Sequence, residues 1–184
     1  MKKIILIVAT ILLTVACSKN EDEPKNPTVN NEPFTFLKVG NEWTYGVYES
    51  GKLIGEFSRK IISENNGCFR VETGPQIFNW FIADDWWQQY EIIDGEHNVN
   101  HTMIFPVNCY VGQVWFRREI LSVAETVIVP AGIFHNCIKI SSTGFWGETS
   151  YLWYHKNYGL VMYEDNHFWQ LLTPTITKLH STNF

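Results

Sequence analysis

Residues 129–137 (VPAGIFHNC) form the stretch that most constrains the fold of this chain. The residues before it, 119–129, are rich in valine and isoleucine, which favour β-strands. Pro130 fixes its φ angle and has no backbone N–H, so that strand must end there or lie at a sheet edge. Gly132 supplies the backbone freedom that a chain reversal needs, and alternating apolar residues resume at Ile138. The stretch therefore predicts a corner between two long strands.

Turn signals divide the rest of the chain into short apolar runs, and no helical periodicity persists over three turns. Asn66-Gly67 is a strong hairpin signal because both residues tolerate positive φ. The aromatic content of 15% also favours strands. Together these features predict an all-β domain, a curved antiparallel sheet of about 9–11 strands (a meander, half-barrel or open barrel) with little helix. The expected strands are 43–48, 53–62, 68–73, 76–83, 86–93, 114–129, 137–143, 149–155, 160–163 and 168–179.

One short pattern occurs twice. Val39-Gly40 precedes Trp43, and Val111-Gly112 precedes Trp115 at the same spacing. In each copy a glycine bend would lead an aromatic side chain into a strand. We interpret the two copies as equivalent corners of one curved sheet.

The N-terminus predicts the cellular address. Lys2 and Lys3 precede an apolar run over residues 4–13, which is too short to span a bilayer and is typical of a signal peptide. The run ends in small residues before Cys17, which resembles the lipobox of bacterial lipoproteins, although Thr14 stands where leucine is usual. We therefore expect residues 1–16 to be removed and Cys17 to be lipidated, which anchors the protein in a membrane. An ordinary secretory signal with a chance cysteine is the alternative.

Residues 17–33 predict a disordered tether, because the segment after Cys17 is rich in Asn, Pro and acidic residues and has almost no apolar side chain. Its acidic residues resemble the surface-export signal of Bacteroidetes lipoproteins, and an indifferent spacer is the alternative. A single all-β domain is expected over residues 34–184. Removing Lys2 and Lys3 with the signal moves the formal charge from −5 to −7, which argues against binding to nucleic acid.

Three cysteines remain in the predicted domain. An odd number outside the cytoplasm allows at most one disulfide, and Cys68, Cys109 and Cys137 all lie in apolar stretches. We expect buried thiols that act as small hydrophobic side chains. A Cys109–Cys137 disulfide is the alternative.

Three segments together resemble a known group of proteins. They are residues 37–45 (LKVGNEWTY), residues 129–134 (VPAGIF), and Trp153-Tyr154 with residues 158–161 (YGLV). This layout is similar to that of uncharacterised Bacteroidetes-type lipoproteins with a GNxWxY opening, a central VPAGxF motif and a GLV hairpin. The resemblance covers about residues 36–172 and implies a curved antiparallel sheet. It implies no activity and no functional residue.

Aromatic residues around the Asp84-Asp85 turn suggest a ligand surface. Neighbouring residues of a strand point to opposite faces, so Trp86 and Trp87 are not expected to face the same core. The outward rings, with those of a second turn, would form an exposed platform for a glycan or a lipid-like ligand. A second layer covering these rings is the alternative. The candidate ligand-binding residues are Trp80, Trp86, Trp87, Tyr90, Phe145 and Trp146.

Catalytic patterns are weak. Glu96, His97 and His101 have metal-ligand chemistry but lie in a polar turn, not on a helix that would align them. Asp84-Asp85 fits a solvated turn better than a pair of acids for sugar hydrolysis. Ser141, Ser142 and His155 lack the context of a nucleophile elbow. We therefore predict no catalytic residue, no metal site and no cofactor.

The sequence as a whole predicts a lipid-anchored protein of the outer membrane, with exposure at the cell surface left open. Its predicted role is to bind a glycan or lipid-like ligand through the tryptophan-rich surface. The alternative is an accessory subunit of an outer-membrane assembly, with the same aromatic residues against a protein partner. A metal-dependent hydrolase is a third, weaker hypothesis.

Overall fold

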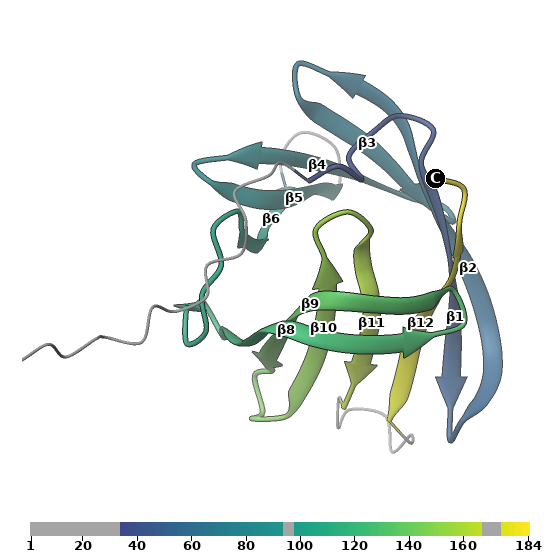
Figure 1. Cartoon of the computed structure of the whole chain (residues 1–184). Coiled ribbons are helices and arrows are strands. Elements are labelled where there is room, and N and C mark those ends of the chain that lie inside the picture. The colour runs from purple at the N-terminus through teal and green to yellow at the C-terminus, as the bar shows by residue number, and fades with distance from the viewer. Residues whose placement is uncertain (1–33, 94–97, 167–173) are drawn as a thin grey trace, which may run out of the picture.

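The computed structural model describes residues 34–93, 98–166 and 174–184, which form one twelve-stranded antiparallel sheet (Figure 1). These residues contain no helix, and therefore none that is long and apolar enough to cross a membrane. The first six strands are β1 (Glu42–Glu49), β2 (Lys52–Asn65), β3 (Cys68–Thr73), β4 (Gln76–Ala83), β5 (Trp86–Ile93) and β6 (Asn98–Pro106). The other six are β7 (Val114–Trp115), β8 (Arg118–Val129), β9 (Gly132–Thr143), β10 (Thr149–His155), β11 (Gly159–Asp165) and β12 (Thr175–Thr182).

The predicted fold class, an all-β curved antiparallel sheet, is confirmed. The sequence did not predict β6, and it predicted β7 and β8 as one strand. β6 has an irregular mixture of polar and apolar residues, which hid its period of two, but it pairs with β5 along its length. The predicted strand 114–129 is broken at Phe116, whose positive φ of 48° turns the chain between β7 and β8.

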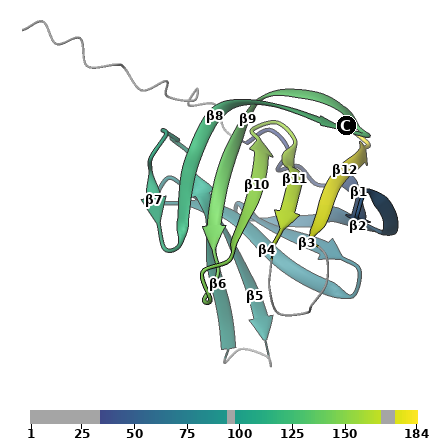
Figure 2. The same ribbon diagram turned by 90° about the horizontal axis from the view of Figure 1, so that it is seen from below.

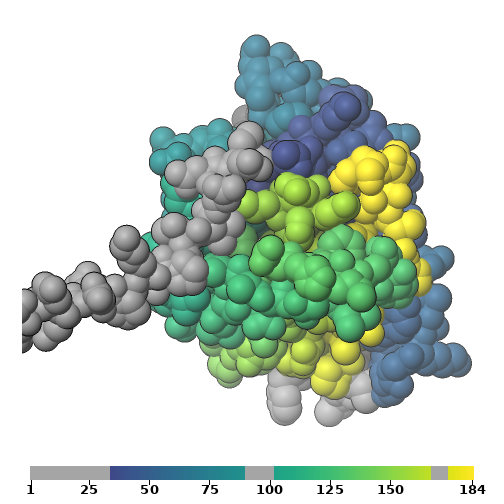
Figure 3. Space-filling model, viewed as in Figure 1, coloured from purple at the N-terminus to yellow at the C-terminus, as the bar shows by residue number. Residues whose placement is uncertain are grey.

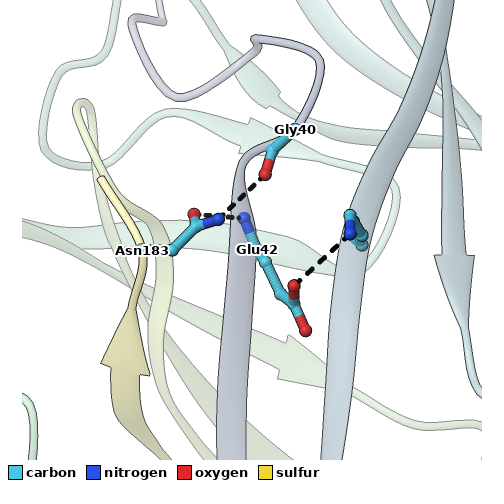
Figure 4. Close-up of polar contacts among 4 residues, drawn as sticks. Gly40, Glu42 and Asn183 are labelled. Carbon is cyan, nitrogen blue, oxygen red and sulfur yellow. Dashed lines mark hydrogen bonds and ion pairs between the residues drawn. The ribbon is translucent and has the colours of Figure 1, made fainter.

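The strand order is β6-β5-β4-β3-β2-β1-β12-β11-β10-β9-β8-β7. The first and last strands pair with each other in the middle of the sheet, so β6 and β7 are the two edges. The Asn183 side chain fastens the end of β12 to the start of β1 (Figure 4). Its Oδ1 accepts a hydrogen bond from the Glu42 N–H at 2.8 Å, and its Nδ2 donates to the Gly40 carbonyl oxygen at 3.0 Å. Glu42 also forms an ion pair with Lys60 of β2, at 3.7 Å.

The predicted corner at residues 129–137 is confirmed as the turn between β8 and β9. Pro130 and Ala131 form the turn, and β9 pairs with β10 only from Ile138 onward. The outer half of the hairpin therefore leaves the sheet and arches across β10, β11 and β12 (Figures 1 and 2). The Ala131 N–H donates to the Leu179 carbonyl oxygen at 3.1 Å, which holds the tip on β12. In Figure 3 the green hairpin surface meets the yellow C-terminal residues.

The core lies inside the curl of the sheet and is largely aromatic. Trp87 is its centre: the ring centroids of Phe36, Trp80, Phe105 and Tyr154 lie 5.0–5.6 Å from its own. Phe36 comes from the segment before β1 and is fully buried, so this segment fills the core although it is not a strand. Within the described residues, this core runs from Phe34 to Leu179.

The two glycine corners are equivalent, as the repeated pattern predicts. Gly40 and Gly112 have φ angles of 93° and 83°, which favour glycine. The Gly40 N–H donates a hydrogen bond to the Ile61 carbonyl oxygen at 2.9 Å. The Gly112 N–H donates in the same way to the Ile120 carbonyl oxygen, at 2.8 Å. Both corners lead into a buried tryptophan, Trp43 and Trp115.

Cys68, Cys109 and Cys137 are thiols in the structure, so the alternative of a Cys109–Cys137 disulfide is wrong. Cys68 is only half-buried, so the expectation of a buried thiol is wrong for Cys68, whereas Cys109 and Cys137 are buried. Burial raises the pKa of each of these two thiols to about 12, because a buried thiolate loses its hydration. Both therefore act as small hydrophobic side chains, as the sequence predicts.

Candidate functional site

The structure separates the predicted aromatic platform into buried and exposed parts. Trp80 and Trp87 are only 3% and 2% exposed, so the prediction of a ligand surface is wrong for these two rings. Both project to the concave side of β4 and β5, where the core needs large side chains. The Trp80 indole N–H donates to the Gln89 side-chain oxygen at 2.8 Å, which satisfies its one donor.

Trp86 lies between these two extremes. It is half-buried, and its ring packs against that of Trp115, with centroids 5.4 Å apart. Trp86 thus helps to cover the space between the two edges of the sheet. Tyr90 lies on β5, and its side chain is outside the part of the chain that the structure describes.

Phe145 and Trp146 are exposed, as the sequence predicts. They lie in the turn between β9 and β10 and are 86% and 71% exposed. Two hydrogen bonds fix this turn: the Gly144 N–H donates to the Glu148 carbonyl oxygen at 2.8 Å, and the Trp146 N–H donates to the Glu148 carboxylate at 3.1 Å. The two rings are therefore presented by a defined backbone.

Phe116 belongs to the same surface, and the sequence analysis missed it. Its ring is 81% exposed at the turn between β7 and β8. One sequence signal could have indicated its exposure: Phe116 stands between Trp115 and two arginines, and this order interrupts the alternation of the expected strand. We call Phe116, Phe145 and Trp146 the aromatic turn patch.

Arg117 connects the two turns that carry this patch. Its guanidinium carbon lies 4.2 Å from the centroid of the Phe145 ring, a cation–π contact. Its Nη1 donates to the Gly144 carbonyl oxygen at 2.9 Å, and its own carbonyl oxygen accepts from the Thr143 N–H at 2.8 Å. Phe116, next to Arg117 in sequence, is therefore held near the turn that carries Phe145.

A cleft of about 480 Å³ lies between these turns and β6. Such a volume lies in the range of about 300–1,000 Å³ that is typical of small-molecule sites. Its walls combine aromatic rings with hydroxyl and guanidinium donors. The lining residues are Thr102, Met103, Phe116, Arg117, Arg118, Ser142 and Phe145.

Arg118, the first residue of β8, lines the cleft and bonds across to the edge strand β6. Its Nη1 donates to the carbonyl oxygens of Met103 and Ile104 on β6, at 3.1 and 3.0 Å. The Trp115 indole N–H also donates to the Met103 oxygen, at 3.4 Å. Side chains of β7 and β8 thus take the place of backbone pairing with this part of β6.

A second hollow, of about 610 Å³, lies beside the corner between β8 and β9. The imidazoles on its walls already have partners: the His155 Nδ1 accepts from the Asn157 N–H, and His180 bonds to Glu56 and Tyr48. Burial lowers the pKa of His155, which favours its neutral form. Because its imidazoles are engaged, we regard the cleft at the aromatic turn patch as the better candidate site.

The weaker catalytic hypotheses gain no geometric support. Among the described residues, no three His, Cys, Asp or Glu side chains come together to hold a metal ion. Glu96 and His97 lie outside the described residues, as does the His101 side chain. The Ser141 hydroxyl bonds to the Glu119 carbonyl oxygen and His155 bonds to Asn157, so these two side chains are engaged elsewhere.

The fold is similar to those of two solved structures. One is a "putative lipoprotein" from Parabacteroides distasonis, with a TM-score of 0.55 and 17% identity over 82% of this chain and 99% of that chain. The other is a "putative exported protein with YmcC-like fold" from Bacteroides fragilis, with a TM-score of 0.54 and 17% identity over 83% of this chain and 100% of that chain. At this identity the likeness concerns the fold alone. No protein-family profile and no curated protein matches the chain.

Proposed function

We propose that this chain is a lipid-anchored protein of the outer membrane that binds a glycan in the cleft beside the aromatic turn patch. One observation carries the proposal: rings from two separate turns stand exposed around a cleft that also presents hydrogen-bond donors. Exposed apolar patches on a folded surface usually mark a contact site.

A sugar fits this combination better than a purely apolar ligand. The faces of a sugar ring carry C–H groups that stack on Phe116 or Phe145, and its hydroxyls need polar partners. Thr102 and Ser142 supply hydroxyls on the cleft wall, and Arg117 supplies guanidinium N–H groups. A ligand without polar groups would leave these donors unsatisfied when it displaced their water.

The proposed address rests on the N-terminal sequence. Residues 1–16 have the pattern of a signal peptide, and Cys17 stands at the position that is lipidated in bacterial lipoproteins. The two proteins of similar fold support this address, since one is named as a lipoprotein and the other as exported.

The alternative of a protein partner has one observation in its favour. The cleft lies beside β6, an edge strand, and an exposed strand edge can pair with an incoming strand. However, Arg118 already occupies the carbonyl oxygens of Met103 and Ile104 at this part of the edge. Strand addition there would have to break both bonds, so we favour the small ligand.

Isothermal titration of residues 18–184 with neutral and acidic oligosaccharides tests the proposal. We expect saturable binding to at least one glycan, weakened about tenfold or more by Phe145→Ala or Phe116→Ala, because both rings line the cleft; tenfold corresponds to about 1.4 kcal/mol of lost contact. Ile128→Ala is the matched control, because Ile128 is 73% exposed at the far hairpin tip. Binding of no glycan, or equal losses in the control, would contradict the proposal.

A further inference from the structure

We infer that the glycan bound in this cleft is acidic and that its carboxylate pairs with Arg117. This inference rests on the proposed function and adds the chemical class of the ligand. The aromatic rings alone do not distinguish a neutral sugar from an acidic one, so the inference is drawn from the charged side chains around the cleft.

Arg117 has donors to spare. A guanidinium has five N–H groups, and in the structure Arg117 uses its Nη1 for the Gly144 carbonyl oxygen. Its flat face rests on Phe145 at 4.2 Å, so its orientation is fixed while its remaining N–H edge is exposed. Neither of these contacts neutralises its charge. A stacked, oriented guanidinium is well suited to bind a carboxylate through two parallel hydrogen bonds.

Arg118, which also lines the cleft, adds a second positive charge. Its guanidinium donates to the carbonyl oxygens of Met103 and Ile104, which are neutral. Its charge extends into the core, where it partly offsets the rise in the pKa of Tyr154 that burial causes. Among the described residues, neither Arg117 nor Arg118 forms an ion pair with an acid.

Two carboxylates lie near the arginines, but within the described part of the chain neither is ion-paired with them. Glu148 accepts the Trp146 N–H, at the end of the turn. Glu119 lines a hollow of about 320 Å³ together with both arginines, but it forms no ion pair with either of them among the described residues. The chain as a whole carries a formal charge of −5, so two adjacent arginines without an acidic partner are a local exception. Charge complementarity therefore favours an anionic ligand.

The aromatic rings decide which anion fits. Phe116 and Phe145 flank the arginine and offer flat faces to a ring, while Ser142 and Thr102 face the hydroxyls. An acidic sugar carries the ring, the hydroxyls and the carboxylate on one frame. A free inorganic anion would leave both phenylalanine rings exposed.

The test compares acidic oligosaccharides with their own carboxyl-reduced, neutral counterparts. Tetramers of galacturonate, glucuronate and mannuronate are titrated into residues 18–184 at about 20 mM and about 500 mM salt, because screening acts on exposed charges. We expect the acidic form of at least one tetramer to bind about tenfold more tightly than its neutral form at low salt, as one charge-assisted pair would give. High salt should reduce this ratio.

Variants then assign the preference. Arg117→Gln should bring the acidic-to-neutral ratio to about one, whatever it does to the affinity for the neutral form, because the ratio isolates the contribution of the carboxylate. Arg70→Gln, an exposed arginine on β3, makes the same charge change away from the cleft and should leave the ratio unchanged. Circular dichroism of each variant confirms that it is folded.

Each other outcome overturns the inference in a distinguishable way. Equal binding of acidic and neutral forms removes the acidic ligand but leaves the proposed function. An acidic preference that Arg117→Gln does not alter places the anion elsewhere. Binding to none of the sugars removes both proposals. Sedimentation with phosphatidylglycerol vesicles, without sugar binding, would instead identify a lipid surface as the partner.

Discussion

Phe36→Ala tests whether the segment before β1 is part of the core. The Phe36 ring is fully buried, and its centroid lies 5.0 Å from that of Trp87 and 6.0 Å from that of Trp43. Phe→Ala at buried sites costs about 3–5 kcal/mol, and more when the surroundings cannot close the cavity. Here the surroundings are stiff, because the backbone of β11 borders the Phe36 ring: a Cβ atom at Gly159 would lie 3.5 Å from it. We therefore expect a loss of about 4 kcal/mol.

Urea unfolding of residues 18–184, followed by tryptophan fluorescence, measures this loss. A loss of this size lowers the melting temperature of a domain of this length by roughly 8–16 °C. Phe145→Ala is the control, because it deletes the same ring from a site that is 86% exposed. Its free energy of unfolding should change by less than about 0.5 kcal/mol. If Phe36→Ala costs less than about 1.5 kcal/mol, or no more than the control, the segment does not belong to the core.

Two further predictions concern the sheet edge and the thiols. Arg118→Met should lower the free energy of unfolding by about 1–3 kcal/mol, because the Met103 and Ile104 carbonyl oxygens lose a charged donor; an unchanged urea midpoint would show that the bridge contributes nothing. In native protein at pH 8, Cys109 and Cys137 should not react with an aromatic disulfide reagent, because a pKa raised to about 12 leaves almost no thiolate. Half-buried Cys68 should react first, and rapid labelling of all three before unfolding would contradict this.

Local patterns predicted the fold well. Alternation located β1 to β5 and β10 to within a few residues, and proline with glycine located the corner between β8 and β9. These features depend on neighbours in sequence, so a sequence carries them directly. The equivalent corners at Gly40 and Gly112 are another local feature, because each is a bend followed by a tryptophan.

The candidate site was harder to predict because it depends on distant contacts. Alternation says that Trp86 and Trp87 face opposite sides, but not which side is concave, nor that Trp115 from the other half of the chain packs on Trp86. The curl of the sheet brings Phe116 and Phe145 to one cleft although 28 residues separate them. Nothing in the spacing of these two turns indicates that Arg117 connects them.

The strand order has a consequence for how this domain can be rebuilt. Taken in the order β7 to β12 and then β1 to β6, each strand pairs in the sheet with the next strand in this order. The first and last strands, β1 and β12, pair with each other, and among the described strands β6 and β7 are the consecutive pair that is not joined in the sheet. A circular permutant that joins β12 to β1 and opens the chain between β6 and β7 would keep every strand pair and become a simple meander. The natural order therefore puts the first and last strands in the interior of the sheet, and the candidate cleft beside the edge strand β6.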